Sequence, residues 1–350
     1  MKKKISIHDL ARELKISATT ISFVLNGKAT EKRISSEVET KILEYIQKVG
    51  YKPNLVAQSL RTGKSKIIAM LVESIDDSFF ASIAKVIEVT AYKLGYKVFF
   101  ASTENETEKA KQLIRLFRDR QVDGFIIAPP PGIEKEITAL LEDNCPVILF
   151  DRHLPTITTT NVLIDNFDGA FSATNHLFEN GFKKIAFVTL DSTQSQMQAR
   201  LDGYQKAIKQ AGTVSKILKL SYNLLHTEIS EKIKEFLQKN KQLDAVLFAT
   251  NYLALGGVDA INQLNLKVPE NLAIIAFDDD LIFQLLSPSV TAVAQPVQEM
   301  SEEVIKQLMK SLAVEDQSAQ QKETIILKTK LIVRKSAINF SSVKNLRTAG

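Results

Sequence analysis

The residues in this sequence that are best suited to chemistry lack the arrangements that catalytic and metal-binding sites need. The four histidines are scattered along the chain without the spacing of metal ligands, and neither a G-x-S-x-G nor a G-x-G-x-x-G motif is present. Gly63-Lys64-Ser65 resembles the end of a phosphate-binding loop, but Gln58 stands five positions before Gly63, where such a loop has glycine. We therefore expect no catalytic residues, no metal site, no cofactor and no enzymatic activity.

A different set of chemically useful residues consists of hydroxyl side chains near the N-terminus. Ser17, Thr19, Thr20 and Ser22 lie at the start of a stretch whose apolar residues recur at helical spacing. Hydroxyl groups at the start of a helix can cap that helix, and they can also contact the phosphates of DNA. Their density favours a helix that reads a DNA groove.

Three short helices would position these hydroxyl groups. Ser6 and Ser17 are candidate caps for a first helix that reaches Leu14 and a second helix over 18–25, and a third helix is predicted from about 35 to Gly50. A turn of a few residues separates the first two helices, which is typical of a helix-turn-helix unit.

The charge distribution agrees with a DNA-binding head. The net charge is +5, but residues 1–66 contain 14 lysines and arginines against 6 aspartates and glutamates, and the remaining residues contain 31 against 34. A basic head on a slightly acidic body indicates that the head binds a polyanion. On composition alone, a solvated lysine-rich terminus is an equal alternative, and the hydroxyl-rich helix decides between them.

Beyond Gly63, apolar strand-like runs alternate with amphipathic helical stretches. The predicted strands are 67–72, 98–101, 125–128 and 147–150 in a first series, and 185–189, 217–220, 245–249 and 272–277 in a second. Continuous apolar runs that alternate with helices are typical of parallel sheets covered on both faces. The fold class of the body is therefore α/β.

The sequence also predicts the compartment. Cys145 is the only cysteine, so no disulfide within the chain is expected and a reducing environment is indicated. The lysines at positions 2–4 are followed by charged residues rather than by an apolar segment, and no apolar run is long enough to span a membrane. We expect a cytoplasmic protein without a membrane partner.

Two longer motifs resemble one protein family. Residues 16–26, ISATTISFVLN, resemble the V-S-x-x-T-V-S-R-V-L-N sequence of the lac repressor family of bacterial transcription regulators. Residues 50–60, GYKPNLVAQSL, are similar to that family's G-Y-x-P-N-x-x-A-x-x-L hinge. The resemblance implies an all-α helix-turn-helix head, joined by a hinge helix to a two-lobed, periplasmic-binding-protein-like domain with parallel sheets.

The resemblance also implies a division of the chain into parts. The expected parts are a DNA-binding domain over 1–50, a hinge over 51–65, a ligand-binding and dimerisation domain over 66–335, and a flexible tail over 336–350. The chain would cross between lobes several times. Lobe 1 would comprise about 66–164 and 292–325, and lobe 2 would comprise about 165–291 and 326–335.

In the head, the resemblance assigns roles in DNA contact. Side chains expected to meet base edges are those of Ala18, Thr19 and Phe23. Side chains expected to hold phosphates are those of Ser17, Thr20, Ser22, Asn26 and Ser35. Phe23 stands where the family usually has arginine, so it would either offer apolar contact, for example to a thymine methyl group, or pack into the head.

In the hinge, the resemblance assigns Leu60 to a minor-groove wedge. Asn54 can cap a helix over 55–61 that is too short to be stable alone in water, and Ala57 matches the small residue that faces the groove. A leucine inserted between base pairs kinks the duplex. The alternative, that Leu60 packs under the ligand-binding domain, is disfavoured by its polar neighbours.

In the body, the resemblance assigns residues to a ligand cleft at strand ends. The expected effector-binding residues are Asp77, Phe79, Phe80, Asp151, Arg152, Arg200, Asn251, Asp278 and Gln295. Planar polar groups around an aromatic platform suit a polyhydroxylated ligand. Three alternatives stay open: a hinge salt bridge for Asp151 and Arg152, a core position for one phenylalanine, and a helix-surface position for Arg200.

Together these inferences predict a transcription regulator. The expected partners are double-stranded operator DNA of pseudo-palindromic sequence, a small-molecule effector that is a sugar or a sugar phosphate, and a second copy of the chain, because a two-fold protein matches a two-fold site. A repressor whose operator affinity is controlled by that effector fits best.

Overall fold

The computed structural model describes residues 5–51, 63–314, 316 and 321–339. The chain divides into two compact units, Met1–Lys66 and Ile67–Gly350, which we refer to as the head and the body. In the described part of the chain, we find no helix that is long and apolar enough to cross a membrane.

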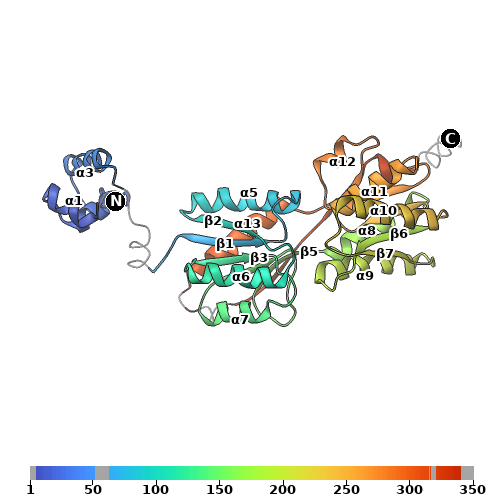
Figure 1. Ribbon diagram of the computed structural model, residues 1–350, viewed down its shortest axis with the longest axis horizontal. Helices are drawn as coiled ribbons and strands as arrows, with labels where there is room; N and C mark the ends of the chain where they lie inside the picture. Colours follow the sequence, from blue (N-terminus) through green and yellow to red (C-terminus); the bar gives the residue numbers. More distant parts are fainter. Residues whose placement is uncertain (1–4, 52–62, 315, 317–320, 340–350) are drawn as a thin grey trace. The chain divides into compact units, whose positions relative to one another are not determined.

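The described residues of the head form the three predicted helices, α1 (Ile7–Leu14), α2 (Ala18–Leu25) and α3 (Ser36–Val49) (Figure 1). A serine caps each of them: the Oγ atoms of Ser6, Ser17 and Ser35 accept the backbone N–H of the third residue that follows. The helices enclose a small core of buried aliphatic side chains, formed by Leu10, Leu14, Ile21, Val24, Ala29 and Ile42. Capping and apolar spacing therefore predicted the head correctly.

In the described residues of the body, the strands form two six-stranded sheets. The first sheet has the order β11-β5-β4-β3-β1-β2, and all its neighbouring strands are parallel. Its strands are β1 (Ile67–Val72), β2 (Lys97–Ser102), β3 (Gly124–Ile127), β4 (Val147–Phe150), β5 (Thr160–Ile164) and β11 (Thr324–Leu327).

The second sheet has the order β12-β10-β9-β8-β6-β7. Its strands are β6 (Ile185–Leu190), β7 (Lys216–Leu220), β8 (Ala245–Phe248), β9 (Ala273–Phe277), β10 (Thr291–Ala294) and β12 (Lys330–Ile332). The edge strand β12 runs antiparallel to β10, whereas the expectation was of parallel sheets. An edge strand that enters from the other sheet can pair in either direction.

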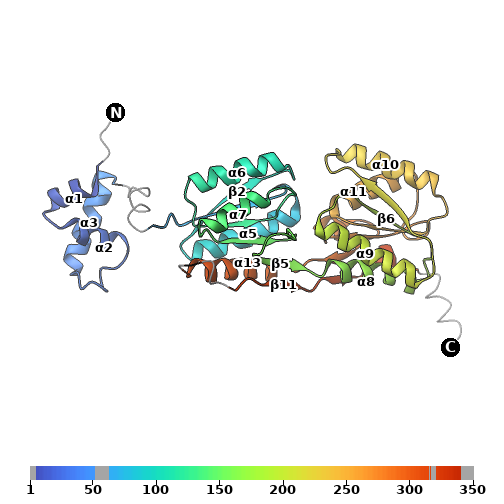
Figure 2. The same ribbon diagram turned by 90° about the horizontal axis from the view of Figure 1, so that it is seen from below.

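Helices cover both faces of each sheet (Figure 2). Around the first sheet lie α5 (Ser78–Lys93), α6 (Thr107–Asp119), α7 (Glu134–Glu142) and α13 (Val297–Leu312). Around the second lie α8 (Asn166–Glu179), α9 (Ser195–Gln210), α10 (His226–Lys239), α11 (Asn251–Gln263) and the short α12 (Leu281–Leu285) and η2 (Lys335–Ala337). Alternate residues of β1 belong to different cores, Met70 with α5 and Leu71 with α6, as expected of a doubly covered parallel strand.

Candidate functional site

The start of α2 presents hydroxyl groups at the surface of the head. Ser17 and Thr19 are exposed, and Ala18, Thr20 and Ser22 are half-buried. The Ser17 Oγ atom accepts the backbone N–H of Thr20 at 3.0 Å and lies 2.8 Å from the Thr20 hydroxyl. Ser17 therefore caps the helix, and its exposure leaves room for the predicted second role at a phosphate.

Two further predicted phosphate contacts lie in the segments that follow. Asn26, which is exposed, donates its side-chain N–H to the Ser22 carbonyl at 2.6 Å. Ser35, also exposed, accepts the Val38 N–H at 3.4 Å. Both side chains help to end or begin a helix, and their contact with DNA stays a prediction.

Phe23 is half-buried and does not belong to the apolar core of the head. The ammonium group of Lys32 lies 5.6 Å from the centre of its ring. A cation over an aromatic face stabilises an exposed ring without burying it. Of the two sequence-based alternatives, this placement favours a ring that is accessible to DNA over one that packs inward.

The hinge residues cannot be placed in the same way. Asn54, Ala57 and Leu60 lie outside the described residues, and the minor-groove wedge stays a prediction.

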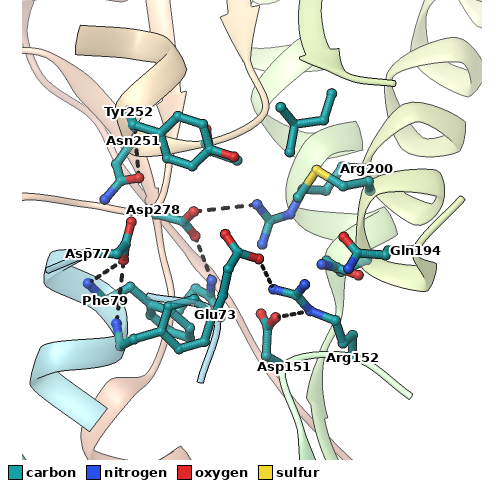
Figure 3. A pocket seen from close by; sticks show the side chains of 16 residues that line it. Glu73, Asp77, Phe79, Asp151, Arg152, Gln194, Arg200, Asn251, Tyr252 and Asp278 are labelled. Carbon is teal, nitrogen blue, oxygen red and sulfur yellow. Dashed lines mark hydrogen bonds and ion pairs between the residues drawn. The ribbon is translucent and has the colours of Figure 1, made fainter. Parts of the chain in front are cut away.

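The body contains a polar cleft at the carboxyl ends of its strands (Figure 3). Its free interior measures about 30 Å³ in this structure, so the lining side chains lie close together and largely fill it. All the predicted effector-binding residues line it: Asp77, Phe79, Phe80, Asp151, Arg152, Arg200, Asn251, Asp278 and Gln295. Each lies just beyond a strand or in the helix that follows one, because the carboxyl ends of parallel strands meet at one edge of a sheet.

Arg152 is the centre of an ion-pair network in the wall of the cleft. Its Nε atom donates to Asp151 and its Nη2 atom to Glu73, both at 2.7 Å, and its Nη1 atom reaches Asn105 at 3.5 Å. All three guanidinium nitrogens therefore have protein partners. The Asp151–Arg152 salt bridge that the sequence left open is present, and it lies in the wall of the cleft.

Arg200 extends from α9 into the body and is 1% exposed. Its Nε atom donates to Asn166 at 2.8 Å and its Nη1 atom to the Ala249 carbonyl at 2.6 Å, with Asp278 at 3.4 Å. The guanidinium stacks 3.7 Å from the centre of the Phe277 ring. The alternative of a pairing role on a helix surface is wrong, because this side chain is buried and holds several elements together.

Asp77 and Asp278 place two carboxylates in the same part of the cleft. Asp77 caps α5 by accepting the backbone N–H of Phe79 at 2.9 Å. Burial, and then the nearby charge of Asp278, raise the pKa of Asp77 to about 6. Burial also raises the pKa of Asp278, although Arg200 and Gln295 oppose that shift. Both groups are thus held where their ionised forms are disfavoured.

Asn251 and Gln295 complete this part of the cleft. The Asn251 side-chain N–H bonds the Ser78 hydroxyl at 3.3 Å, and the Gln295 N–H bonds Asp278 at 2.5 Å. The Oε1 atom of Gln295 is buried and has no hydrogen-bond donor among the described residues. An acceptor of this kind is available to a ligand.

The two phenylalanines have different surroundings. Phe80 is 4% exposed and packs edge-on against Phe150 in the core, with ring centres 6.2 Å apart. Phe79 is half-buried, and its ring lies 5.0 Å from that of Phe80. The expectation that one ring belongs to the core therefore holds for Phe80, and Phe79 is the ring available for stacking.

Several lining residues were not identified from the sequence: Glu73, Leu190, Gln194, Gln196, Met197, Thr250 and Tyr252. Glu73 directly follows β1, as Asp151 follows β4, so the strand-end argument could have found it. Gln194 and Gln196 come from the turn and first residues of α9, where the sequence carries no motif.

Hydrogen bonds also join the two sides of the cleft. Gln194 donates to Asn105 at 2.7 Å, and the Ser78 hydroxyl donates to Asp280 at 2.5 Å. The two residues of each pair are at least 89 positions apart in the sequence. One of them lies beside the first sheet and the other beside the second sheet. These two hydrogen bonds link the two sides of the cleft in this structure.

Comparisons with known proteins find the same two parts. Residues 6–54 match the family described as bacterial regulatory proteins, lacI family, and residues 174–337 match a periplasmic binding protein-like domain. A curated relative, the HTH-type transcriptional regulator RegA of Clostridium saccharobutylicum, is 29% identical over 341 residues, which cover 95% of this chain and 99% of the relative.

Two solved structures are similar in fold. A periplasmic binding protein/LacI transcriptional regulator from Alkaliphilus metalliredigens, complexed with D-xylulofuranose, has a TM-score of 0.71 and 25% identity, covering 78% of this chain and all of that one. The lac repressor dimer bound to operator has a TM-score of 0.82 over 96% of this chain and all of that one; at 21% identity this likeness shows the fold alone.

Proposed function

Because the chain belongs to the lacI family of bacterial regulatory proteins, we propose that it represses transcription by binding operator DNA with an affinity that a small-molecule effector controls. The observation that carries this proposal is the presence, in one chain, of a helix-turn-helix head and a polar cleft lined by residues from two sheets. Its role is recognition rather than catalysis.

In the head, Ala18, Thr19 and Phe23 read base edges. Ser17, Thr20, Ser22, Asn26 and Ser35 hold phosphates, which fixes the position of α2 on the duplex. The exposure of Ser17, Thr19, Asn26 and Ser35 supports these roles. In the hinge, a helix capped by Asn54 brings Ala57 and Leu60 to the minor groove.

In the body, the effector is a sugar or sugar derivative. Carboxylates, amides and guanidinium groups at one cleft, with Phe79 beside them, provide the paired hydrogen bonds and the stacking surface that a polyhydroxylated ring needs. The sugar bound in the relative from Alkaliphilus metalliredigens supports this class of ligand.

The protein acts as a homodimer in the cytoplasm. Two heads related by two-fold symmetry match a pseudo-palindromic operator. The residues from 66 to 335 then form the ligand-binding and dimerisation domain. The chain crosses from one lobe to the other near residues 164, 291 and 325.

DNA binding can be tested by selecting duplexes from a random pool with the full-length chain. We expect enrichment of one pseudo-palindrome. Thr19→Ala should weaken its binding by about 1–3 kcal/mol, because a base-edge contact is lost. Thr40→Ala, which changes an exposed threonine on α3, is the matched control and should bind as the parent does. A pool without any enriched sequence would contradict the proposal.

Effector control can be tested with the enriched duplex. Sugars that raise the melting temperature of the protein should also change its affinity for this duplex in a gel-shift titration at fixed salt. A sugar that binds the cleft but leaves the affinity for DNA unchanged would separate binding from regulation and refute the regulatory part.

A further inference from the structure

The cleft carries more negative than positive charge. Its lining includes four carboxylates, from Glu73, Asp77, Asp151 and Asp278, and two guanidinium groups, from Arg152 and Arg200. The imbalance is therefore two negative charges when all four carboxylates are ionised.

The guanidinium groups already have carboxylate partners. Arg152 forms ion pairs with Asp151 and Glu73, and Arg200 lies 3.4 Å from Asp278. Asp77 has no ion pair with a described lysine, arginine or histidine; it bonds backbone N–H groups of α5 and the side-chain amide of Asn251. The raised pKa of Asp77 agrees with a carboxylate that lacks a cation.

Two buried side-chain acceptors that line the cleft have no hydrogen-bond donor among the described residues. Gln196 is 3% exposed and lines the cleft, and its Oε1 atom has no donor among the described residues. The Oε1 atom of Gln295 also has no hydrogen-bond donor among the described residues. In contrast, every guanidinium nitrogen of Arg152 already donates to a protein oxygen. Buried acceptors without donors cost free energy that a donating ligand would recover.

Charge and hydrogen bonding therefore favour one kind of ligand. A phosphate or carboxylate ligand would add negative charge and further acceptors to a cleft that already has net negative charge and two acceptors without donors. An uncharged sugar would supply donors and leave the charge unbalanced. A ligand that carries an ammonium group supplies positive charge and three N–H donors in one group.

We propose, resting on the proposed regulatory function, that the effector is an amino sugar or another polyhydroxylated amine, whose ammonium group lies between Asp77 and Asp278. These two carboxylates face the same part of the cleft (Figure 3), and Asp278 is the acidic neighbour that acts on Asp77. The hydroxyl groups of the ligand then donate to Gln196 and Gln295, and Phe79 lies against the ring.

The proposal is tested by calorimetric titration of the full-length chain at pH 7.5 with matched ligands. The probes are D-glucosamine, D-galactosamine and D-mannosamine, each beside its parent sugar, its N-acetyl form and its 6-phosphate. We expect at least one amine to bind about tenfold or more tightly than its parent, since a charge-assisted bond is gained. We expect the N-acetyl form and the phosphate to lose this advantage. Binding of a parent sugar or phosphate that equals that of its amine, or no binding by any amine, would overturn the proposal.

Asp77→Asn provides the matched variant. The asparagine oxygen can still cap α5, so the fold is kept while one negative charge is removed. The preference for the amine over its parent should fall about tenfold. Asp143→Asn removes the same charge from a partly exposed ion pair with Arg118 on α6, outside the cleft lining, and should keep the full preference. An unchanged preference in Asp77→Asn would overturn the assignment of the ammonium group.

A gel-shift titration with the enriched duplex separates the two proposals. If a parent sugar binds best and changes the affinity for DNA, the regulatory function stands and the amine proposal fails. If an amine binds the cleft without changing the affinity for DNA, the amine proposal stands and the regulatory function fails.

Discussion

At the scale of single residues, Phe23 offers the sharpest test of DNA recognition. Its ring lies outside the core of the head, with the ammonium group of Lys32 over it, at the position where the motif that residues 16–26 resemble has arginine. We predict that Phe23→Arg adds a guanine to the sequence selected from a random duplex pool, because arginine can donate two hydrogen bonds to guanine in the major groove.

The matched control is Phe23→Leu, which keeps an apolar side chain. It should select the same sequence as the parent, since contact with a thymine methyl group is retained. Discrimination of about 1–3 kcal/mol at the contacted base pair is expected for the arginine variant. An identical selected sequence for all three proteins would show that this side chain does not read bases.

The protonation of Asp77 makes the stability of the protein depend on pH. Its pKa of about 6 in the folded protein lies above its ordinary value of 3.8, so the folded state binds this proton more tightly than the unfolded state does. The stability gained from this proton is complete below about pH 3.8 and is lost as pH rises through about 6. The other titratable groups that line the cleft are Glu73, Asp151, Arg152, Arg200, Tyr252 and Asp278.

We therefore predict that Asp77→Asn, without ligand, is more stable than the parent at pH 7.5, and that the difference shrinks at pH 5. A difference of about 1 kcal/mol corresponds to roughly 2–4 °C in melting temperature for a domain of this size. Thermal unfolding of both proteins at the two pH values measures it. A difference that is the same at pH 5 and pH 7.5 would show that Asp77 has an ordinary pKa.

The sequence located these residues better than it described their interactions. Motifs and predicted strand ends identified nine effector residues, and the structure places all nine in the lining of one cleft. They did not reveal that Arg152 is shared by Asp151 and Glu73, or that Gln196 has an acceptor without a donor. Such facts depend on which side chains converge from distant parts of the chain, and local pattern does not contain that information.

At the scale of elements, α9 holds Arg200 in place through a close approach to α8. A side-chain carbon at Gly203 would lie 2.2 Å from the backbone oxygen of Phe167, so only glycine fits there. We predict that Gly203→Ala lowers the free energy of unfolding by about 1–3 kcal/mol, because the helices must move apart. The displacement of α9 should also weaken ligand binding.

Asp202→Ala is the control for this prediction. Asp202 neighbours Gly203 on α9 but is exposed, and alanine is favourable in a helix, so its change should cost little. Urea unfolding of both variants compares them. Equal stability of Gly203→Ala and the parent would mean that α8 and α9 can separate without cost.

Elements with strong local signals were predictable, and those defined by long-range pairing were not. The eight predicted strands correspond to β1–β4 and β6–β9, which their apolar runs mark as strands. The edge strands β2 and β7 are only partly buried. The short strands β5, β10, β11 and β12 were missed, because they complete the sheets only after distant segments pair. Ser336, at the start of the predicted tail, is buried and bonds the Ile274 carbonyl at 2.6 Å, a contact that no local pattern indicates.

The hinge supplies a second prediction about an element. Leu60→Ala should reduce operator affinity on the order of tenfold, because a wedge that kinks the duplex is lost. Ligand affinity, measured by calorimetry, should not change. Ser59→Ala alters the neighbouring residue and serves as the control. Equal operator affinity for the parent and Leu60→Ala at fixed salt would exclude the wedge.

At the scale of the whole molecule, the cleft can control the head only if the protein has two conformational states that differ at both sites. The cleft has bonds across it that can distinguish such states, between Asn105 and Gln194 and between Ser78 and Asp280. A ligand shifts the balance between two states only by the difference in its affinity for them. The body therefore regulates DNA binding only to the extent that ligand binding makes or breaks contacts of this kind.

This requirement gives a quantitative prediction. If the effector changes operator affinity by some factor, operator DNA must change effector affinity by the same factor, because the two binding events form a closed thermodynamic cycle. Coupling factors of about 5–150 are typical of allosteric coupling between two binding sites. Calorimetric titration of the effector into the protein, alone and saturated with the enriched duplex, gives one factor, and gel-shift titration with and without effector gives the other. A scrambled duplex at the same concentration controls for nonspecific binding and should leave effector affinity unchanged. An effector affinity that is the same with and without operator DNA would show that the cleft does not control the head.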